Sequence, residues 1–180
     1  MARAKPETSL RRLIVRRKPA QASRGVLLAG PLALPVALGR AGIKANKREG
    51  DGATPRGGFR LKRLWWRADR HPRPATLLPV RPIGAEDGWC EDPADRRYNR
   101  PLKLSPASTA DRLRRDDRLY DFIVELDHNT RPRIAGRGSA VFIHVARPGF
   151  APTAGCVALD INSLRRLLAR IGPRTRIVVD

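Results

Sequence analysis

Apolar and polar positions alternate over short stretches in most of this chain, and a period of two along the sequence is typical of β-strands. The stretches expected to form strands are residues 10–17, 59–66, 119–127, 139–144 and 176–179. Residues 26–38 are expected to add a hairpin that turns at Gly30-Pro31. Because residues 10–17 mix β-branched with basic side chains, we expect an edge strand there whose charges prevent further pairing.

Two segments favour helices instead. In residues 161–171, apolar side chains recur at helical spacing, with arginines on the opposite face. Asp160 is the expected N-cap of this helix, and Gly172-Pro173 is its expected end. Residues 108–117 form a shorter and more polar helix candidate.

Length and punctuation limit the architecture to one small domain. A chain of 180 residues is long enough to bury one core, and its 16 prolines and 15 glycines divide it into short elements. We therefore expect a flexible segment at residues 1–9 and a single β-rich α+β domain over residues 10–180, with one or two short helices. The irregular stretch at residues 67–105 is long for a compact domain, and such stretches commonly form a lid or a substrate wall.

The chain is strongly basic, with 37 Lys and Arg residues against 17 Asp and Glu residues and a formal net charge of +20. Such a charge attracts polyanions, whether nucleic acid, an anionic membrane surface or an anionic cell-wall polymer. A nucleic-acid-binding protein is therefore one alternative. Against it, aromatic residues make up only 5% of the chain, the basic residues are scattered, and no recognition-helix or zinc pattern occurs.

No apolar run approaches the roughly 20 residues of a membrane span, so we expect none. Residues 26–38 superficially resemble the core of an export signal, because they are apolar and follow an arginine-rich start. Two prolines interrupt them and no clear small-residue cleavage site follows, so we assign them to the hairpin. An export signal within this stretch stays an alternative.

The candidate chemistry lies between His144 and Cys156. His144 ends an apolar run, and Cys156 follows twelve positions later, after the turn-forming sequence Thr153-Ala-Gly155. A cysteine attacks as its thiolate, which needs a nearby base or positive charge. The glycine lets the backbone approach a substrate carbonyl, where main-chain N–H groups would stabilise an oxyanion. Since such a nucleophile must stay free, we interpret the second cysteine, Cys90, as a small core residue.

Several short motifs resemble those of one enzyme family. Ile143-His144 and Thr153–Val157 fit a histidine followed by Ser or Thr, any residue, Gly, Cys, and Ile or Val. The other matching positions are Lys47, Asp51, Thr54-Pro55, Gly57, Phe59 and Gly138-Ser139. Over residues 10–179 the chain thus resembles the L,D-transpeptidase catalytic domain, the YkuD-like family, as a divergent small single-domain branch. The resemblance implies a β-sandwich or barrel.

The resemblance also implies a cysteine-dependent acyltransferase that acts on peptidoglycan. Cys156 would be the nucleophile and His144 its general base, while Thr153 and Gly155 would shape the turn whose N–H groups hold the oxyanion. The thiolate attacks one stem peptide, expels its terminal D-amino acid and forms a thioester, which the amine of a second stem peptide resolves into a cross-link. The implied partners are these donor and acceptor peptides, and the resemblance implies no metal or cofactor. It also implies a monomer in the periplasm or cell wall whose cysteine carbapenems acylate.

The chain departs from the family pattern in three places. Ala158 stands where a donor-binding Arg or Asn is common, Val145 stands where Gly or Ser usually follows the histidine, and the interval between the histidine and the cysteine is short. We therefore expect altered donor recognition. A cross-link that joins positions 1 and 3 of the stems, rather than 3 and 3, is one form that this alteration would take.

Other polar side chains are candidates for contacts with the substrate. Those closest to the catalytic motifs or to the long irregular stretch are Arg147, Arg67, Asp69, Tyr98, Asn99, Tyr120 and Asp121. Of these, Arg147 would pair with a substrate carboxylate in a bidentate arrangement. Because no acceptor motif is recognisable, a peptidase or amidase that passes the same thioester to water stays open as the main alternative.

Overall fold

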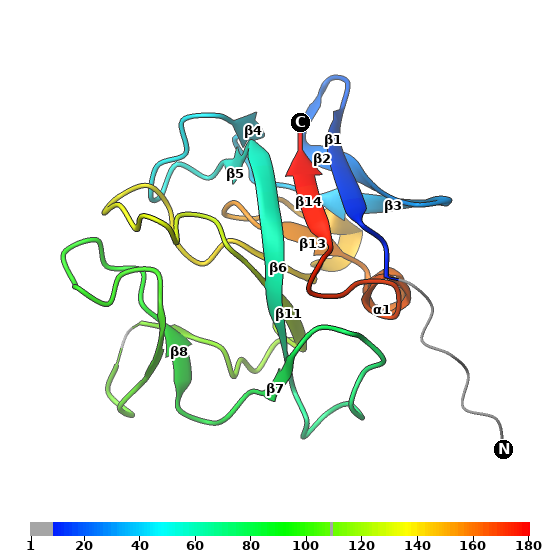
Figure 1. Ribbon diagram of the computed structural model, residues 1–180. Helices are drawn as coiled ribbons and strands as arrows, with labels where there is room; N and C mark the ends of the chain where they lie inside the picture. The colour runs from blue at the N-terminus through cyan, green and yellow to red at the C-terminus, as the bar shows by residue number, and fades with distance from the viewer. Residues whose placement is uncertain (1–8, 109) are drawn as a thin grey trace, which may run out of the picture.

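A closed β-barrel forms the centre of the protein. The computed structural model describes residues 9–108 and 110–180, and the expected N-terminal segment at residues 1–9 lies almost wholly outside them. The largest sheet has the order β11-β12-β13-β3-β2-β1-β14-β6-β7, and the pairing of β11 with β6 closes eight strands into a mixed barrel (Figure 1). The barrel strands are β1 (Arg12–Lys18), β2 (Gln21–Ala29), β3 (Leu32–Ala37), β6 (Gly57–Trp66), β11 (Phe122–Leu126), β12 (Phe142–Val145), β13 (Val157–Leu159) and β14 (Arg176–Val179). The β-rich α+β class is confirmed.

Shorter elements surround the barrel. They are β4 (Ile43–Lys44), β5 (Thr54–Pro55), β7 (Val80–Pro82), β8 (Asp87–Trp89), β9 (Pro101–Lys103), β10 (Asp111–Arg112), the 3-10 turn η1 (Pro148–Phe150) and the helix α1 (Ile161–Leu168). The segment between β6 and β11 (residues 67–121), here called the excursion, is coloured green in Figure 1. Within it, strands β10, β8 and β9 form a separate small sheet. The excursion thus carries its own sheet and stands beside the barrel.

Strands β11 and β12 and the C-terminal end of β6 are buried on both faces. In β12, Ile143 and Val145 point into the barrel core, whereas Phe142 packs into a second cluster outside it. That second cluster consists of Trp65, Ile83, Trp89, Leu113, Ile123, Ala140, Phe142 and Cys156, with Tyr120 against it. Because successive side chains of a strand point to opposite faces, alternate residues of β6, β11 and β12 serve the two cores in turn. The excursion therefore covers the outer face of the strands that lead to the cysteine.

The expectation of an edge strand at residues 10–17 is wrong. Strand β1 lies inside the sheet, antiparallel to β2 and parallel to β14. Leu13 and Val15 are buried, while Arg12 and Arg16 are exposed on the alternate face. The charges therefore mark the solvent face of a barrel strand, which needs polar side chains just as an edge does.

The expected hairpin at residues 26–38 is confirmed by β2 and β3. Its apolar side chains, among them Leu27, Leu34 and Val36, belong to the barrel core. The stretch that resembles an export signal is thus part of the folded barrel. Within the described part of the chain, no helix is long and apolar enough to cross a bilayer.

The helix expected at residues 161–171 is confirmed as α1, although it ends at Leu168, before the expected end at Gly172-Pro173. The helix expected at residues 108–117 is wrong. The described part of residues 108–117 instead contains β10, whose Asp111 and Arg112 pair with Trp89 and Gly88 of β8. A polar segment without an apolar stripe gains little by forming a helix, so tertiary strand pairing decides its structure. Helix α1 does bury such a stripe, formed by Leu164, Leu167 and Leu168.

Asp160 caps α1 and provides a test of this local structure. Its Oδ1 accepts hydrogen bonds from the N–H groups of Asn162 and Ser163 at 3.1 and 2.9 Å. Removing an N-cap side chain costs about 1 kcal/mol, so Asp160→Ala should lower the free energy of unfolding by about that amount in urea denaturation. Asn162→Ala removes an exposed side chain from the same turn and is the matched control. Equal effects of the two substitutions would contradict the capping role.

Candidate active site

The pairing of β12 with β13 sets the positions of His144 and Cys156. The two strands are parallel, with Ile143 opposite Val157 and His144 opposite Ala158. Cys156, just before β13, is therefore level with Phe142, and the Phe142 N–H donates to Cys156 Sγ at 3.4 Å. Residues two apart along a strand share a face, so His144 and Cys156 lie diagonally on the outer face of the barrel. The sequence analysis identified these two residues, and the fold brings them to one face.

The Cys156 thiol is buried and neutral. Its side chain is 9% exposed, and Sγ donates to the Ala140 carbonyl oxygen at 3.2 Å. Burial raises the pKa of Cys156 to about 12, although the hydrogen bond from the Phe142 N–H opposes this rise. Both cysteines of the chain are free, and Cys90 is buried as expected. Cys156 thus needs help from a base, because it carries almost no thiolate near neutral pH.

His144 is held as a neutral imidazole. Its ring Nδ1 lies 2.8 Å from the carbonyl oxygen of Val145, and since a carbonyl only accepts, Nδ1 carries the proton. Nε2 therefore has the free lone pair and, among the described residues, no hydrogen-bond partner. Burial lowers the pKa of His144 to about 4. The Tyr120 ring packs against the imidazole in a T-shaped arrangement, with 5.5 Å between the ring centroids. The imidazole is therefore neutral at pH 7, with its lone pair on Nε2.

The turn before the cysteine is closed by Thr153. Its hydroxyl donates to the Cys156 carbonyl oxygen at 2.8 Å and accepts from the Gly155 N–H at 3.1 Å. The Gly155 N–H is therefore engaged within the turn. Gly155 has φ of +148°, and a Cβ on it would lie 2.7 Å from the Ala53 carbonyl oxygen. Only glycine fits this position without strain, because other residues rarely adopt such a φ.

The charged loop at residues 47–54 packs against this turn and supports it. Lys47, which is 6% exposed, donates through Nζ to Asp51 Oδ1 at 2.6 Å and to the Arg48 carbonyl oxygen at 2.8 Å. Asp51 also accepts from the Ala53 N–H at 2.8 Å, which fixes the carbonyl that Gly155 approaches. The Thr54 hydroxyl accepts from the Gly39 N–H at 2.9 Å. These family-like loop positions are therefore structural supports around the Cys156 turn.

Two cavities meet at Cys156. The larger one, about 540 Å³, is lined by Arg40, Glu91, Asp111, Arg115, Leu119, Tyr120, His144, Arg147, Ala151, Pro152, Thr153, Ala154 and Cys156. The smaller one, about 110 Å³, shares Arg40, Glu91, Tyr120, Ala154 and Cys156 and adds Lys47, Glu49 and Ser139 among others. Both candidate catalytic side chains thus line one cavity that also offers three arginines and two carboxylic acids.

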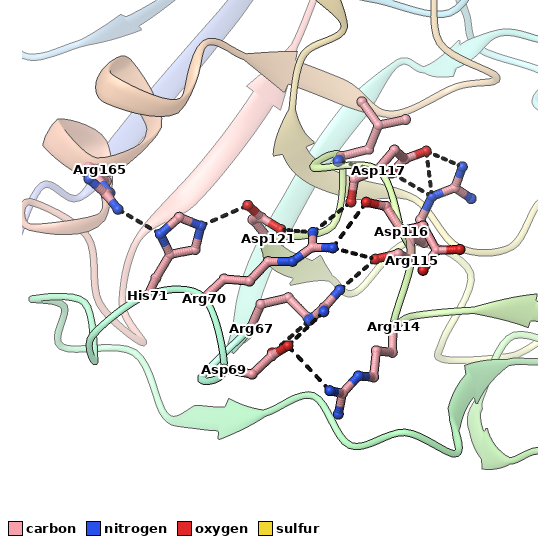
Figure 2. Close-up of polar contacts among 11 residues, drawn as sticks. Arg67, Asp69, Arg70, His71, Arg114, Arg115, Asp116, Asp117, Asp121 and Arg165 are labelled. Atoms are coloured by element: carbon pink, nitrogen blue, oxygen red, sulfur yellow. Dashed lines mark hydrogen bonds and ion pairs between the residues drawn. The ribbon is translucent and has the colours of Figure 1, made fainter.

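Arg147 lines the larger cavity, whereas Arg67 and Asp69 lie away from it. Arg67 is 5% exposed and forms a two-pronged ion pair with Asp69 at 2.8 and 2.7 Å. Figure 2 shows Arg67 and its neighbour Arg70 pointing at the segment that carries Arg115. Arg67 donates to the Arg115 carbonyl oxygen at 2.5 Å, and Arg70 donates to those of Arg115, Asp116 and Asp117. The two arginines therefore fix the backbone of residues 115–117, which we call the cavity wall, from the side away from the cavity.

Asp121 belongs to the same buried network. It is 1% exposed and accepts from Arg70 at 2.8 Å, while its second oxygen lies 2.7 Å from His71 Nε2. Arg165 of α1 donates to the other nitrogen of His71, as Figure 2 shows. Tyr120, the residue before Asp121, points the other way and lines both cavities. Asp121 thus anchors the wall, and Tyr120 forms part of the surface that faces the cavities.

Tyr98 and Asn99 lie one layer behind the cavity. Tyr98 is buried, donates through its hydroxyl to Glu49 and accepts from the Gly138 N–H. Asn99 Oδ1 accepts from the Trp89 indole N–H and from the Ala140 N–H at 3.1 and 3.2 Å. Ala140 has a left-handed φ of +50°, and its carbonyl oxygen is the one that accepts from Cys156. Asn99 therefore helps to hold the backbone against which the thiol rests.

Several cavity residues carried no local signal in the sequence. Arg40 lies just after β3, Glu91 just after β8, and Asp111 and Arg115 in or after β10. The sequence indicated a cavity wall only through the length of the irregular stretch expected at residues 67–105. Asp111 and Arg115 lie beyond the end of that stretch. Ala158 pairs directly with His144 and is 1% exposed, so the position opposite the imidazole in the neighbouring strand carries no charge of its own.

The comparisons with known proteins agree with this geometry. A family model described as the L,D-transpeptidase catalytic domain (YkuD) matches residues 17–179, which is nearly the whole chain. No similar curated protein and no similar solved structure was found.

The neutral thiol predicts a particular pH dependence of alkylation. In a Cys90→Ser variant, where Cys156 is the one remaining thiol, the rate of reaction with iodoacetamide should rise about tenfold per pH unit from pH 7 to 9. It should not level off, because the pKa of Cys156 is raised to about 12, and His144, with a pKa of about 4, does not titrate in this range. A plateau near neutral pH would instead reveal a resting thiolate–imidazolium pair.

Gly155 offers a second test, of the turn itself. Gly155→Ala places a methyl group against the Ala53 carbonyl and strains a positive φ, so the free energy of unfolding should fall by about 2 kcal/mol. Gly58→Ala is the control, because a Cβ there meets nothing within 4 Å and its φ is not in the left-handed region. The measurement is denaturant unfolding of both variants. A Gly155→Ala protein as stable as Gly58→Ala would contradict the close approach.

Proposed function

The chain belongs to the L,D-transpeptidase catalytic-domain family, and from that premise we propose that it cross-links peptidoglycan stem peptides through a thioester at Cys156. Membership confirms the resemblance drawn from the motifs. The observation that supports the assignment of residues most directly is that His144 and Cys156 line one cavity, with the imidazole Nε2 unprotonated. A buried nucleophile and a neutral base on one face suit acyl transfer.

In the first half-reaction, the donor carbonyl enters the larger cavity beside Sγ. The thiol proton moves to His144 Nε2 as sulfur attacks the carbonyl carbon, and the Cys156 N–H stabilises the oxyanion, since the Gly155 N–H is engaged by Thr153. The C–N bond then breaks, and His144 returns the proton to the departing amine. Because the thiol and the imidazole are both neutral beforehand, proton transfer accompanies attack rather than preceding it.

In the second half-reaction, the amine of another stem peptide attacks the thioester. His144 Nε2 takes a proton from this amine and delivers it to sulfur as the C–S bond breaks. The product is a new peptide bond between the two stems, and Cys156 is restored as a thiol. If water takes the place of the amine, the same steps give hydrolysis of the donor, so the acceptor alone separates the transpeptidase from the peptidase.

Donor recognition is assigned to the arginines of the cavity. Ala158 supplies no charge beside His144, whereas Arg40, Arg115 and Arg147 line the same cavity. Arginine binds carboxylates through two parallel hydrogen bonds, and the stem peptide ends in a carboxylate. We therefore infer that these arginines replace the missing donor-binding residue and that their different placement alters which bond of the stem reaches Cys156, with a 1–3 cross-link as the altered register.

The proposed substrate also bears on location and charge. Peptidoglycan lies outside the cytoplasmic membrane, so an extracytoplasmic location follows from the family. A net charge of +20 suits association with an anionic cell-wall polymer. This attraction is expected to weaken with salt, because solvent-exposed charges are screened within about 10 Å at 0.1 M ionic strength.

The decisive test of the function is a muropeptide assay on purified sacculi. Cys156→Ala should abolish new cross-links, since no other described thiol faces the cavity that holds His144. The wild type should also gain the mass of a carbapenem on the peptide that contains Cys156. Cys90→Ala, which removes the other buried thiol, is the matched control and should retain cross-linking.

The products decide between the alternatives. Cross-linked dimers support the transpeptidase and give their register directly, while shortened stems without dimers support the peptidase. Full cross-linking by Cys156→Ala would overturn the assignment of the nucleophile.

A further inference from the structure

Two carboxylic acids stand where the larger cavity meets a neighbouring groove. The groove, about 580 Å³, runs along the small sheet of the excursion, and Glu91 and Asp111 line both it and the larger cavity. Asp92 and Asp95 also line this groove, together with Lys103 and with Arg97, which pairs with Asp95. The lining thus has four acidic residues against two basic ones. An acidic surface is unexpected in a chain with a net charge of +20. The excursion therefore joins an acidic groove to the cavity that holds Cys156.

Glu91 is the acid without a protein partner. Asp111 accepts from the Tyr120 hydroxyl at 3.2 Å and lies 3.8 Å from an Arg115 nitrogen. Across residues 9–108 and 110–180, by contrast, Glu91 has no hydrogen bond and no ion pair. It lines the smaller cavity as well, so it borders both cavities that Cys156 lines and the groove beside them. Glu91 is exposed to solvent while it lines these spaces, so its carboxylate is accessible to a ligand that enters them.

The negative charges of these acids oppose ionisation of the Cys156 thiol unless a bound cation neutralises them. After burial, the negative charges of Asp111 and Glu91 are among the causes that raise the pKa of Cys156. Loss of solvation, reinforced by Asp111 and Glu49, also raises the pKa of Glu91 to about 7. A bound ammonium group would relieve both effects, because it neutralises the carboxylates next to the reacting sulfur.

We propose that Glu91, supported by Asp111, binds the ammonium group of the acceptor stem peptide and directs it to the Cys156 thioester. This inference rests on the proposed transpeptidase function and adds the residues that select the acceptor. The unpartnered Nε2 of His144, a side chain only 7% exposed, faces the same cavity and would receive the second proton of that amine. The acidic groove then holds the acceptor strand, and the arginine-lined side of the cavity holds the donor.

The step balances in atoms and charge. The acceptor arrives as R–NH3⁺ and gives one proton to the Glu91 carboxylate, which passes it to water. The neutral amine attacks the thioester carbonyl, and the C–N bond forms as the C–S bond breaks. The remaining excess proton moves from nitrogen to His144 Nε2 and from there to sulfur. The products are an amide, the Cys156 thiol and one released proton.

The partition of a single acyl-enzyme tests this role. Wild type and E91Q are acylated with the same tetrapeptide donor, and the ratio of aminolysis to hydrolysis is measured with a synthetic tetrapeptide that carries a free side-chain amine. Because both products arise from the same thioester, the ratio does not depend on the rate of acylation. E91Q keeps the size of the side chain and removes its charge, so the ratio should fall about tenfold or more.

Two controls make the result specific. E86Q changes an exposed acid of the same excursion that lines none of these cavities, and its ratio should match the wild type. The same acceptor peptide acetylated on its side-chain amine lacks the ammonium group, so it should give no aminolysis with any variant. D111N should lower the ratio less than E91Q, since Asp111 is already hydrogen-bonded to Tyr120.

The outcomes separate this inference from the function on which it rests. If Cys156 of the wild type forms no acyl-enzyme, the transpeptidase assignment fails and the acceptor role fails with it. If the acyl-enzyme forms and E91Q partitions like E86Q, the acceptor role of Glu91 is overturned while the transpeptidase assignment stands. A selective loss of aminolysis in E91Q supports both.

Discussion

The parallel pairing of β12 with β13 is the constraint on which the rest of the site depends. With Ile143 opposite Val157, every second residue of both strands enters the barrel core, and the residues between them, His144 and Cys156, must leave it. A shift of this register by one residue would send the cysteine into the barrel and a core valine outward. The hydrophobic core of the barrel thereby fixes the geometry of the reactive pair.

A site on the outer face of a barrel strand needs a second cover, and the excursion between β6 and β11 supplies it. Its own small sheet and the cluster around Trp65, Trp89 and Phe142 exclude water from one side of Cys156. Arg67 and Arg70 hold the cavity wall at residues 115–117 through its backbone carbonyls, so these contacts fix its path without limiting which side chains face the cavity. The barrel thus positions the candidate nucleophile, and the excursion covers it from outside.

The sequence predicted the parts of this structure that depend on local signals. Alternation located most strands of the barrel, a cap and an apolar stripe located α1, and the Thr-Ala-Gly-Cys turn located the candidate nucleophile. Pairing partners were harder, because the alternation in residues 10–17 looks the same at an edge and inside a barrel. The cavity wall was harder still. Tyr98 and Asn99 are polar residues in a long irregular stretch, and only the fold shows that they turn toward Glu49 and Ala140 and away from the cavity.

The left-handed backbone at Ala140 has a consequence for the lifetime of the protein. Its carbonyl oxygen accepts the hydrogen of the Cys156 thiol. Burial raises the pKa of this thiol, so the sulfur rests in its protonated form. Peroxide and stray electrophiles react with thiolates rather than thiols. A buried thiol that stays protonated near neutral pH is therefore expected to react slowly with such oxidants.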